Sequence, residues 1–272
     1  MIAAAVQMNA GPDFDRNVEL AFALVAEACR QGARIVALPE NFSFLRTDSR
    51  VPLSAHELES QFVQRLRRLA ADLNIYLLAG SFHERVAGRE KLFNTSLLIG
   101  PTGELLGVYR KIHLFDISLP GGPRFQESAR FEPGADFVTC ATADGSFGLS
   151  ICYDLRFPEL YRALAGQGAQ VLFIPSAFTT ATGREHWEVL VRCRAIENLC
   201  YVIAPALVGD PSPKIHNYGH SLIVDPWGKV LASAGDMDQG CILAELDLET
   251  LHSRREQLPA LRHRRISIES LK

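Results

Sequence analysis

The sequence predicts an α/β protein built as a four-layer αββα sandwich, in which two mixed β-sheets pack face to face between outer helices. Three observations indicate this class. Short apolar runs alternate with amphipathic stretches, Pro-x-Gly turns join neighbouring runs as hairpins, and part of the second half repeats the first. Continuous Val/Ile/Leu runs are typical of strands buried on both faces. The 272 residues contain no linker or low-complexity tract, so we expect a single domain over residues 1–272.

The first half begins with a predicted strand, IAAAVQM at residues 2–8. A helix is expected from Asp13 or Asp15, either of which could cap it, to about Gln31. Its apolar face would contain Val18, Phe22, Val25 and Ala26. The elements expected next are the strand RIVALP, a helix over residues 57–73, the strands NIYLLAG and NTSLLIG, a Pro-Thr-Gly turn at 101–103 and the strand ELLGVYR.

The second half follows the same alternation. PELYRALAGQG is predicted as a helix because proline favours the first turn. The remaining expected elements are the strands FGLSIC and QVLFIP, a helix over residues 185–199, and the strands YVIAP, HSLIVD, KVLAS and CILAEL.

An internal repeat relates the two halves. With a shift of 125 positions, residues 74–106 fall on residues 199–231 without a gap. NIYLLAG then meets LCYVIAP, and SLLIGPTGELL meets SLIVDPWGKVL; at a slightly different shift, RIVALPENF meets QVLFIPSAF. Similar hairpins can arise by chance, but here the match includes the strand before each hairpin. We therefore expect two similar layers related by a pseudo-twofold axis, with the ends of RIVALP and QVLFIP at one edge of the sandwich.

Composition narrows the function classes. The net charge is −3 and the pI is about 6.2, which does not favour nucleic acid or an acidic membrane surface as a partner. The N-terminus has no signal-peptide pattern, and no run approaches the roughly 18 apolar residues of a membrane span, so we expect a cytoplasmic protein. The six cysteines form no C-x-x-C pair, which argues against a zinc knuckle or a thioredoxin-like motif.

Three chemically useful side chains stand at predicted strand ends. Glu40 follows IVALP, Lys111 follows LLGVYR, and Cys152 ends FGLSI before a helix. Each residue could instead have no chemical role: Glu40 and Lys111 could be solvated surface charges, and Cys152 could be a small buried apolar side chain. Together they supply what amide hydrolysis by a thiol requires: a base for the thiol proton, a cation for the oxyanion and a nucleophile. Backbone N–H groups from Tyr153 onward, at the expected helix start, would add to the oxyanion site.

The settings LPENF, YRKIHLF and SICYDLRFPE, in this order, resemble the nitrilase superfamily of carbon–nitrogen hydrolases over nearly the whole chain. The resemblance implies an αββα sandwich, hydrolysis of a non-peptide C–N bond, and no metal or organic cofactor. It makes Glu40 the general base, Lys111 the electrostatic stabiliser and Cys152 the nucleophile. A homodimer is expected by analogy with the family.

The resemblance also implies a second active-site glutamate after the lysine. Within FQESARFEPG, Glu127 matches the family's position for this glutamate more closely than the competing Glu132 does. Glu127 could instead be a surface carboxylate without a catalytic role. Arg156, four residues after Cys152, could pair with Glu159 or bind a substrate carboxylate through two hydrogen bonds. The CYDxRFPE form favours the second role.

The remaining candidates carry weaker signals. Tyr153, Phe178 and Thr179 are expected to bind substrate as pocket-wall residues. His186 and Trp187 could lie near the pocket or simply pack at a helix start. We expect no metal site at His216 and His220, because their surroundings do not read as a helix and no third ligand is evident, while Gly219-His220-Ser221 lacks the frame of a serine hydrolase. An ion network is the expected role of Arg192, Arg194 and Glu197.

Within the superfamily, the sequence looks most like the deaminated glutathione amidases, which release 2-oxoglutarate and cysteinylglycine. The nearest alternative is ω-amidase activity on 2-oxoglutaramate or 2-oxosuccinamate. From other classes, a catalytically silent partner-binding relative is disfavoured because all three triad positions are intact, and an acyltransferase that passes the thioester to an amine is also compatible with the residues.

Overall fold

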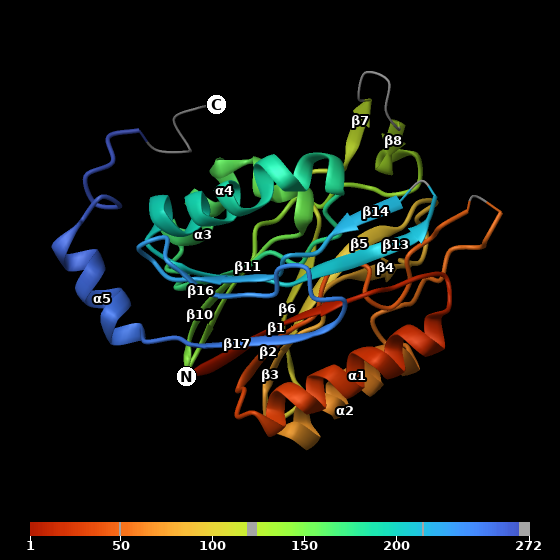
Figure 1. Cartoon of the computed structure of the whole chain (residues 1–272), viewed down its shortest axis with the longest axis horizontal. Helices are drawn as coiled ribbons and strands as arrows, with labels where there is room; N and C mark the ends of the chain where they lie inside the picture. The colour runs from red at the N-terminus through yellow and green to blue at the C-terminus, as the bar shows by residue number, and fades with distance from the viewer. Residues whose placement is uncertain (49, 119–123, 214, 267–272) are drawn as a thin grey trace.

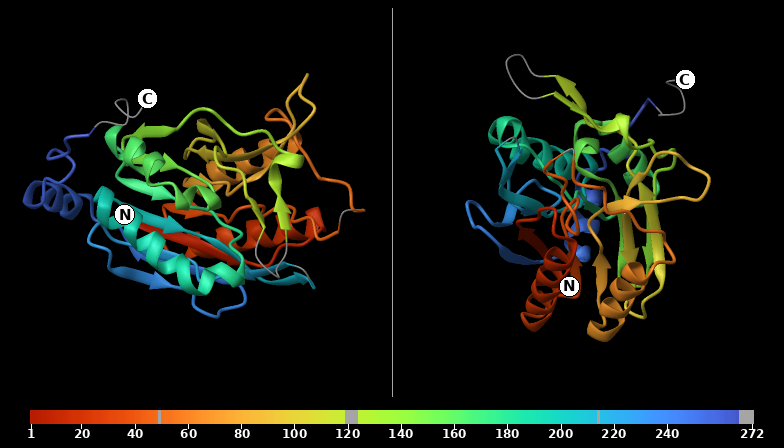
Figure 2. Two further views of the ribbon diagram at one scale, coloured as in Figure 1. Left: turned by 90° about the horizontal axis from the view of Figure 1, so that it is seen from above. Right: turned by 90° about the vertical axis from the view of Figure 1, so that its right-hand side faces the viewer.

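The computed structural model describes residues 1–48, 50–118, 124–213 and 215–266. Two large β-sheets lie between two pairs of helices (Figures 1 and 2). The larger sheet contains β1 (Ile2–Met8), β2 (Ile35–Ala37), β3 (Tyr76–Leu78), β4 (Phe82–Glu84), β5 (Phe93–Ile99), β6 (Leu105–Arg110), β13 (Ala206–Ser212), β14 (Ile215–Tyr218) and β17 (Gly240–Glu245). The smaller sheet contains β9 (Thr139–Thr142), β10 (Gly145–Leu149), β11 (Val171–Phe173), β12 (Tyr201–Ala204), β15 (Leu222–Val224) and β16 (Val230–Ser233).

The helices cover the outer faces of the sheets. The larger sheet carries α1 (Phe14–Arg30) and α2 (Gln61–Leu73), and the smaller sheet carries α3 (Pro158–Gly166) and α4 (Thr180–Asn198) (Figure 1). The other elements are the hairpin of β7 (Asp116–Ser118) and β8 (Arg124–Gln126), the 3-10 helices η1 (Glu127–Ala129) and η2 (Cys152–Arg156), and α5 (Leu248–Gln257). The predicted αββα sandwich with two mixed sheets is confirmed. No helix among the described residues is long and apolar enough to cross a membrane.

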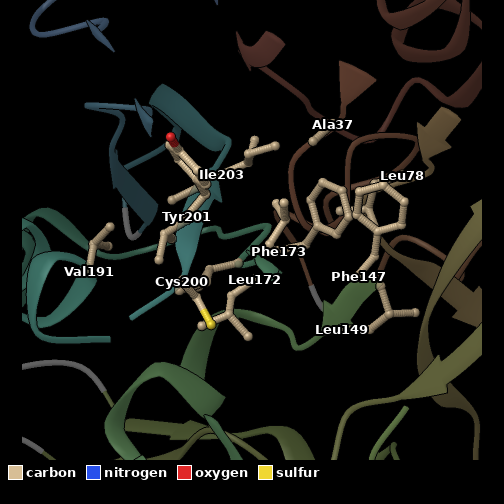
Figure 3. Close-up of a cluster of buried hydrophobic side chains, with 14 of the residues drawn as sticks. Ala37, Leu78, Phe147, Leu149, Leu172, Phe173, Val191, Cys200, Tyr201 and Ile203 are labelled. Atoms are coloured by element: carbon tan, nitrogen blue, oxygen red, sulfur yellow. The ribbon is translucent and has the colours of Figure 1, made fainter. Parts of the chain in front are cut away.

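One hydrophobic core lies between the sheets and continues under α3 and α4. Tyr76 of the larger sheet contacts Phe147 of the smaller sheet, with ring centroids 5.4 Å apart. Figure 3 shows part of this core, including Leu78 from the larger sheet and Phe173 from the smaller one. A second core fills the space between the larger sheet and α1 and α2. Because strand side chains alternate, Ala3 faces the first core and Ala4 the second.

Helix ends differ in detail from the sequence expectation. Asp13, and not Asp15, caps α1, because its side chain accepts the backbone N–H of Arg16. Ser60 caps α2, so this helix begins at Gln61 and not at residue 57. Helix α4 begins five residues earlier than expected, at Thr180. Strands β4, β7, β8, β9, β13 and β14 and helix α5 had no counterpart among the expected elements.

The internal repeat is visible in strand pairing. In the larger sheet β2 pairs parallel with β3, which pairs antiparallel with β5; in the smaller sheet β11, β12 and β15 repeat this arrangement. Leu77 lies opposite Ile99, and the positions 125 residues later, Val202 and Val224, also lie opposite each other. The two halves therefore share register as well as topology.

The repeat extends to the turns. Asn74 and Leu199, 125 positions apart, both end a helix in the left-handed conformation, with φ of 52° and 47°. Gly103 and its equivalent Gly228 both have φ of 82°, a value that favours glycine. The carbonyl of each glycine accepts a hydrogen bond from an arginine Nε. Arg67 is the donor in the first half and Arg192 the donor in the second, again 125 positions apart.

Candidate active site

A cavity of about 230 Å³ opens beside the carboxyl ends of strands from both sheets. Glu40, Lys111, Glu127 and Cys152 all border it. Their positions follow from the topology: Lys111 comes directly after β6, while Glu40 and Cys152 each come three residues after β2 and β10. The strand ends that the sequence indicated are thus brought together at one edge of the sandwich.

Cys152 lies in a sharp turn between β10 and η2. Its φ is 45°, in the left-handed region that non-glycine residues adopt at a cost of about 1–3 kcal/mol. Its backbone N–H donates to the carbonyl of Pro175 at 2.9 Å, which ties the turn to the segment after β11. The residue is 8% exposed. The expected helix dipole is not beside it, because α3 begins only at Pro158 and a short 3-10 helix intervenes.

Asp154 stabilises this turn through hydrogen bonds, a role that the sequence did not predict. Its carboxylate accepts the backbone N–H of Ile151 at 2.8 Å and the hydroxyl of Tyr109 at 2.7 Å. It also accepts the backbone N–H of His113 at 3.1 Å and lies 2.7 Å from the Nδ1 atom of that ring. Asp154 therefore connects the turn that carries Cys152 to the segment that carries Lys111.

Glu40 is 3% exposed and both of its carboxylate oxygens are hydrogen-bonded. Oε1 accepts from Lys111 Nζ and from Asn94 Nδ2, each at 2.9 Å. Oε2 accepts the backbone N–H of Ala177 at 2.9 Å, across the boundary between the two sheets. A carboxylate with this many donors is fixed in orientation, with one oxygen toward the lysine and one toward the segment after β11.

Glu127, and not Glu132, reaches the site. Its Oε2 accepts from Lys111 Nζ at 3.0 Å and from the backbone N–H of Phe115 at 2.6 Å. Glu132 instead pairs with Arg89 at 3.2 Å and is not among the residues that line the cavity. Glu127 thus provides the lysine ammonium with a second carboxylate partner beside Glu40.

Asn94, near the start of β5, is a further site residue that the sequence reasoning missed. Its Nδ2 group donates to Glu40 Oε1 at 2.9 Å and to Glu127 Oε1 at 3.1 Å, so one amide serves both carboxylates. Its backbone carbonyl accepts the N–H of Lys111 at 2.8 Å. One sequence feature could have indicated Asn94: it is a polar amide directly after a phenylalanine in a buried strand, where a polar side chain needs hydrogen-bond partners.

The electrostatics of the cluster couple the thiol to its neighbours. Burial raises the pKa of Cys152 well above its ordinary value, the charge of Glu40 raises it further, and Lys111 offsets part of this effect. For Lys111, burial alone would lower the pKa, but the carboxylates of Glu127 and Glu40 outweigh burial and hold it well above its ordinary value. At neutral pH the resting site therefore holds a thiol beside a lysine ammonium.

The pocket-wall candidates also border the cavity. Arg156 lies over the rings of Tyr153 and Phe178, with its guanidinium carbon 5.9 Å and 5.2 Å from their centroids. Its Nη1 atom is 3.2 Å from Nδ1 of His186. No pair between Arg156 and Glu159 occurs in the part of the chain described. Thr179 lines the same wall, whereas Trp187 is buried and donates to the carbonyl of His220.

The other candidates make structural contacts. His216 lies 2.8 Å from Asp210, and the residues described include no cluster of three or more metal-ligating side chains. Arg194 pairs with Glu197 at 2.7 Å and donates to the carbonyl of Leu155. Arg192 contacts Glu188, so it stands apart from that pair.

Comparison with known proteins agrees with this geometry. Residues 2–256 match the family model described as carbon-nitrogen hydrolase. The chain is 45% identical over 266 residues to deaminated glutathione amidase from Synechocystis, covering 97% of each chain. It is 41% identical to human omega-amidase NIT2, covering 96% of this chain and 94% of that one. The crystal structure of Nit3 from Saccharomyces cerevisiae, a member of branch 10 of the nitrilase superfamily, superposes with a TM-score of 0.87 at 35% identity, covering 98% and 97% of the two chains.

Fold, cavity and comparisons define a hydrolase that acts on non-peptide C–N bonds. The chain belongs to the carbon-nitrogen hydrolase family, the nitrilase superfamily. The resemblance that the three sequence motifs indicated is confirmed.

Proposed function

We propose that the chain is a cysteine-dependent amidase that forms a thioester between Cys152 and the acyl half of its substrate. The observation that carries the proposal is the lysine ammonium held between two carboxylates beside a buried thiol. In this proposal Glu40 is the general base and Lys111 stabilises the oxyanion. Glu127 positions Lys111 and completes the catalytic group.

The first half-reaction begins with a neutral thiol. Because the pKa of Cys152 is raised, its proton moves to Glu40 as the sulfur attacks the amide carbon, and no thiolate accumulates beforehand. The C–S bond forms and the carbonyl electrons move to oxygen, where Lys111 Nζ and the N–H of Tyr153 stabilise the negative charge. The intermediate then collapses, the C–N bond breaks, and Glu40 returns the proton to the leaving amine.

The second half-reaction uses water in place of the thiol. Glu40 takes a proton from the water molecule as its oxygen attacks the thioester carbon, and the same cation and N–H stabilise the new oxyanion. Collapse releases the carboxylic acid and restores the Cys152 thiol, which regains the proton from Glu40. The balance requires one amide and one water and yields one acid and one amine.

Arg156 supports an acyl half that carries a carboxylate. A guanidinium held over Tyr153 and Phe178 presents its planar edge for a two-pronged hydrogen bond to a carboxylate. In this proposal, Tyr153, Phe178 and Thr179 contact the carbon chain of the substrate that links its carboxylate to the amide. A 2-oxo acid with a distal amide fits this spacing.

The favoured substrate is deaminated glutathione, hydrolysed to 2-oxoglutarate and cysteinylglycine. The support is the 45% identity to a relative named for that activity, together with Arg156 at the cavity wall. The second candidate is 2-oxoglutaramate, which releases ammonia; the support for it is the 41% identity to human omega-amidase NIT2.

Side-by-side measurement of kcat/KM for the two substrates tests this choice. We expect deaminated glutathione to be preferred. A preference of about tenfold or more for 2-oxoglutaramate, equal to about 1.4 kcal/mol, would assign the protein to the ω-amidases. Hydrolysis of neither substrate would contradict the proposed function.

The proposal extends to the protein's setting. A homodimer is supported by exposed apolar side chains on one helix: Val189 and Ile196 of α4 are 62% and 48% exposed. A cytoplasmic location is supported by six free cysteines, since reducing compartments keep thiols unpaired. We treat residues 1–272 as one catalytic domain. Light scattering of the purified protein tests the dimer.

A further inference from the structure

The cavity carries more positive than negative side chains. Among the described residues that line it, four are cationic, namely Arg46, Lys111, Arg130 and Arg156, and two are carboxylates, Glu40 and Glu127. Both carboxylates contact Lys111 and are engaged by it. The two carboxylates are thus engaged by Lys111, and the three arginines add further positive charge to the cavity lining. A site with this surplus favours a substrate with two negative charges.

The three arginines come from different segments of the cavity lining. Arg156 contacts Tyr153 and Phe178, which belong to the turn after β10 and the segment after β11. Arg46 lies in the loop between β2 and α2, and Arg130 directly follows η1. The proposed catalytic group contacts residues close in sequence to Phe178 and Arg130. Glu40 accepts from Ala177, next to Phe178, and Lys111 contacts Glu127, three residues before Arg130.

Arg46 and Arg130 both border the cavity, where their like charges repel each other. Burial lowers the pKa of Arg46 and the charge of Arg130 lowers it further, while Asp48 offsets part of the effect. The Arg46 Nε atom donates to the backbone carbonyl of Asp48 at 3.0 Å, which anchors the side chain. The Asp48 carboxylate is itself held by Arg50 at 2.6 Å. Two guanidiniums that border one cavity and repel each other can together serve as a receptor for an anion.

We propose that Arg46 and Arg130 form a second carboxylate subsite, which binds the amine half of the substrate. The inference rests on the proposed function, in which Arg156 binds the carboxylate of the acyl half. The substrate class is then an amide with one carboxylate on each side of the scissile C–N bond.

This subsite separates the two candidate substrates. The leaving amine of 2-oxoglutaramate is ammonia, which offers nothing to Arg46 and Arg130. Cysteinylglycine is the amine half of deaminated glutathione. Its carboxylate stands at the end of the glycine residue, two residues along the chain from the scissile amide nitrogen. Specificity then comes from the leaving group, while the acyl half is the same in both substrates.

The test measures binding without turnover. Calorimetry on the Cys152→Ala protein compares deaminated glutathione with its C-terminal amide, which differs only in the charge of that carboxylate. We expect the acid to bind about tenfold or more tightly than the amide, the scale of a charge-assisted hydrogen bond. Adding Arg130→Gln or Arg46→Gln should reduce this ratio to about threefold or less. Arg130 is exposed, so its replacement spares the fold.

A matched control is Arg85→Gln, an exposed arginine that does not line the cavity; it should leave the ratio unchanged. Equal binding of acid and amide, a ratio that persists in both arginine variants, or no binding of either ligand would each overturn the subsite. Hydrolysis assays on the protein with Cys152 intact are run in parallel. Failure there counts against the proposed function, whereas the binding ratio alone decides the subsite.

Discussion

Asn94 Nδ2 donates a hydrogen bond to Glu40 Oε1 at 2.9 Å, joining residues 54 positions apart in the sequence. The same nitrogen donates to Glu127, so a single amide helps to hold the buried Glu40 and the partly exposed Glu127 beside Lys111. We therefore treat Asn94 as a positioning residue for the proposed catalytic group.

Asn94→Ala should lower kcat by about tenfold to a hundredfold, because a misplaced base loses the geometry that proton transfer needs. Asn94→Asp should be worse, since it adds a third carboxylate around one ammonium. Steady-state kinetics on a 2-oxo amide measures the effect. Asn198→Ala is the control, because the Asn198 side chain is equally buried but donates only to Arg194 and Glu197 of its own helix, α4. Equal losses of activity in the two alanine variants would mean that Asn94 acts only through stability.

Cys152→Ala should abolish turnover and leave the fold intact, since only one small side chain is lost. Intact-mass measurement during turnover should show an acyl adduct on the wild-type protein and none on the variant. Cys140→Ala is the matched control, because Cys140 is also buried and burial raises its pKa to about 11, yet it does not line the cavity. Full activity of Cys152→Ala would refute the thioester.

Lys111→Met and Glu40→Gln should each lower kcat by about 10² or more, the scale for loss of oxyanion or general-base help. Lys111→Met also leaves the buried Glu40 carboxylate without its cation, so we expect a loss of about 3–5 kcal/mol in unfolding free energy. Urea denaturation measures that loss.

Lys111→Arg should not restore activity, because a planar fork does not replace a compact ammonium between two carboxylates. Lys91→Met, at an exposed lysine that donates to the Ser128 carbonyl, is the control for a lost lysine. Near-normal rates for Lys111→Arg would show that the position needs only a positive charge.

Arg156→Ala should reduce kcat/KM for 2-oxo acid amides by about tenfold or more, since a charge-assisted pair to the substrate carboxylate is lost. The reduction for short uncharged amides should be much smaller, because they carry no group for the guanidinium. Parallel kinetics on 2-oxoglutaramate and propionamide gives the comparison. Equal losses of kcat/KM on both amides would mean that Arg156 has a structural role in the cavity and does not recognise the substrate.

His83 should contribute to acid sensitivity. Burial lowers its pKa to about 4, so the folded state resists the protonation that the unfolded chain undergoes near pH 6.5. Because the folded pKa is depressed, the stabilisation is present above pH 6.5 and is lost as the pH falls toward 4. The loss is about 3 kcal/mol, at 1.4 kcal/mol per pH unit.

Urea denaturation of His83→Gln at pH 7 and pH 4.5 should show a correspondingly weaker pH dependence than the wild type. The exposed His263→Gln should behave as the wild type. Identical pH dependence in all three proteins would show that His83 is not the group responsible.

The sequence alone predicted the sandwich, the repeat and the convergence of Glu40, Lys111 and Cys152. The reason is physical: parallel strands place their carboxyl ends at one edge, so residues just after such strands meet. The resemblance to the family favoured Glu127 over Glu132, and the structure places Glu127 at the cavity and Glu132 outside it. The catalytic roles of these residues remain predictions until the variants above are measured.

Contacts between distant segments were not predictable in this way. Asn94 and Asp154 matter through partners 33 to 54 positions away, and no local pattern names those partners. Strand β13 was missed because glycine and proline interrupt its apolar pattern, yet it pairs in parallel with β1. The helix dipole at Cys152 was wrongly expected because a 3-10 turn and an α-helix begin with similar residues.

The hydrogen bond from the Ala177 N–H to Glu40 places the cavity on the seam between two halves that share one architectural plan. Each half has an arginine that donates to a turn glycine at the same register. The proposed reactive groups are divided: Glu40 and Lys111 come from the first half and Cys152 from the second. Neither half is a smaller version of the enzyme. The same arrangement of strands and turns therefore occurs twice, and the proposed reactive groups lie at positions where the two halves differ.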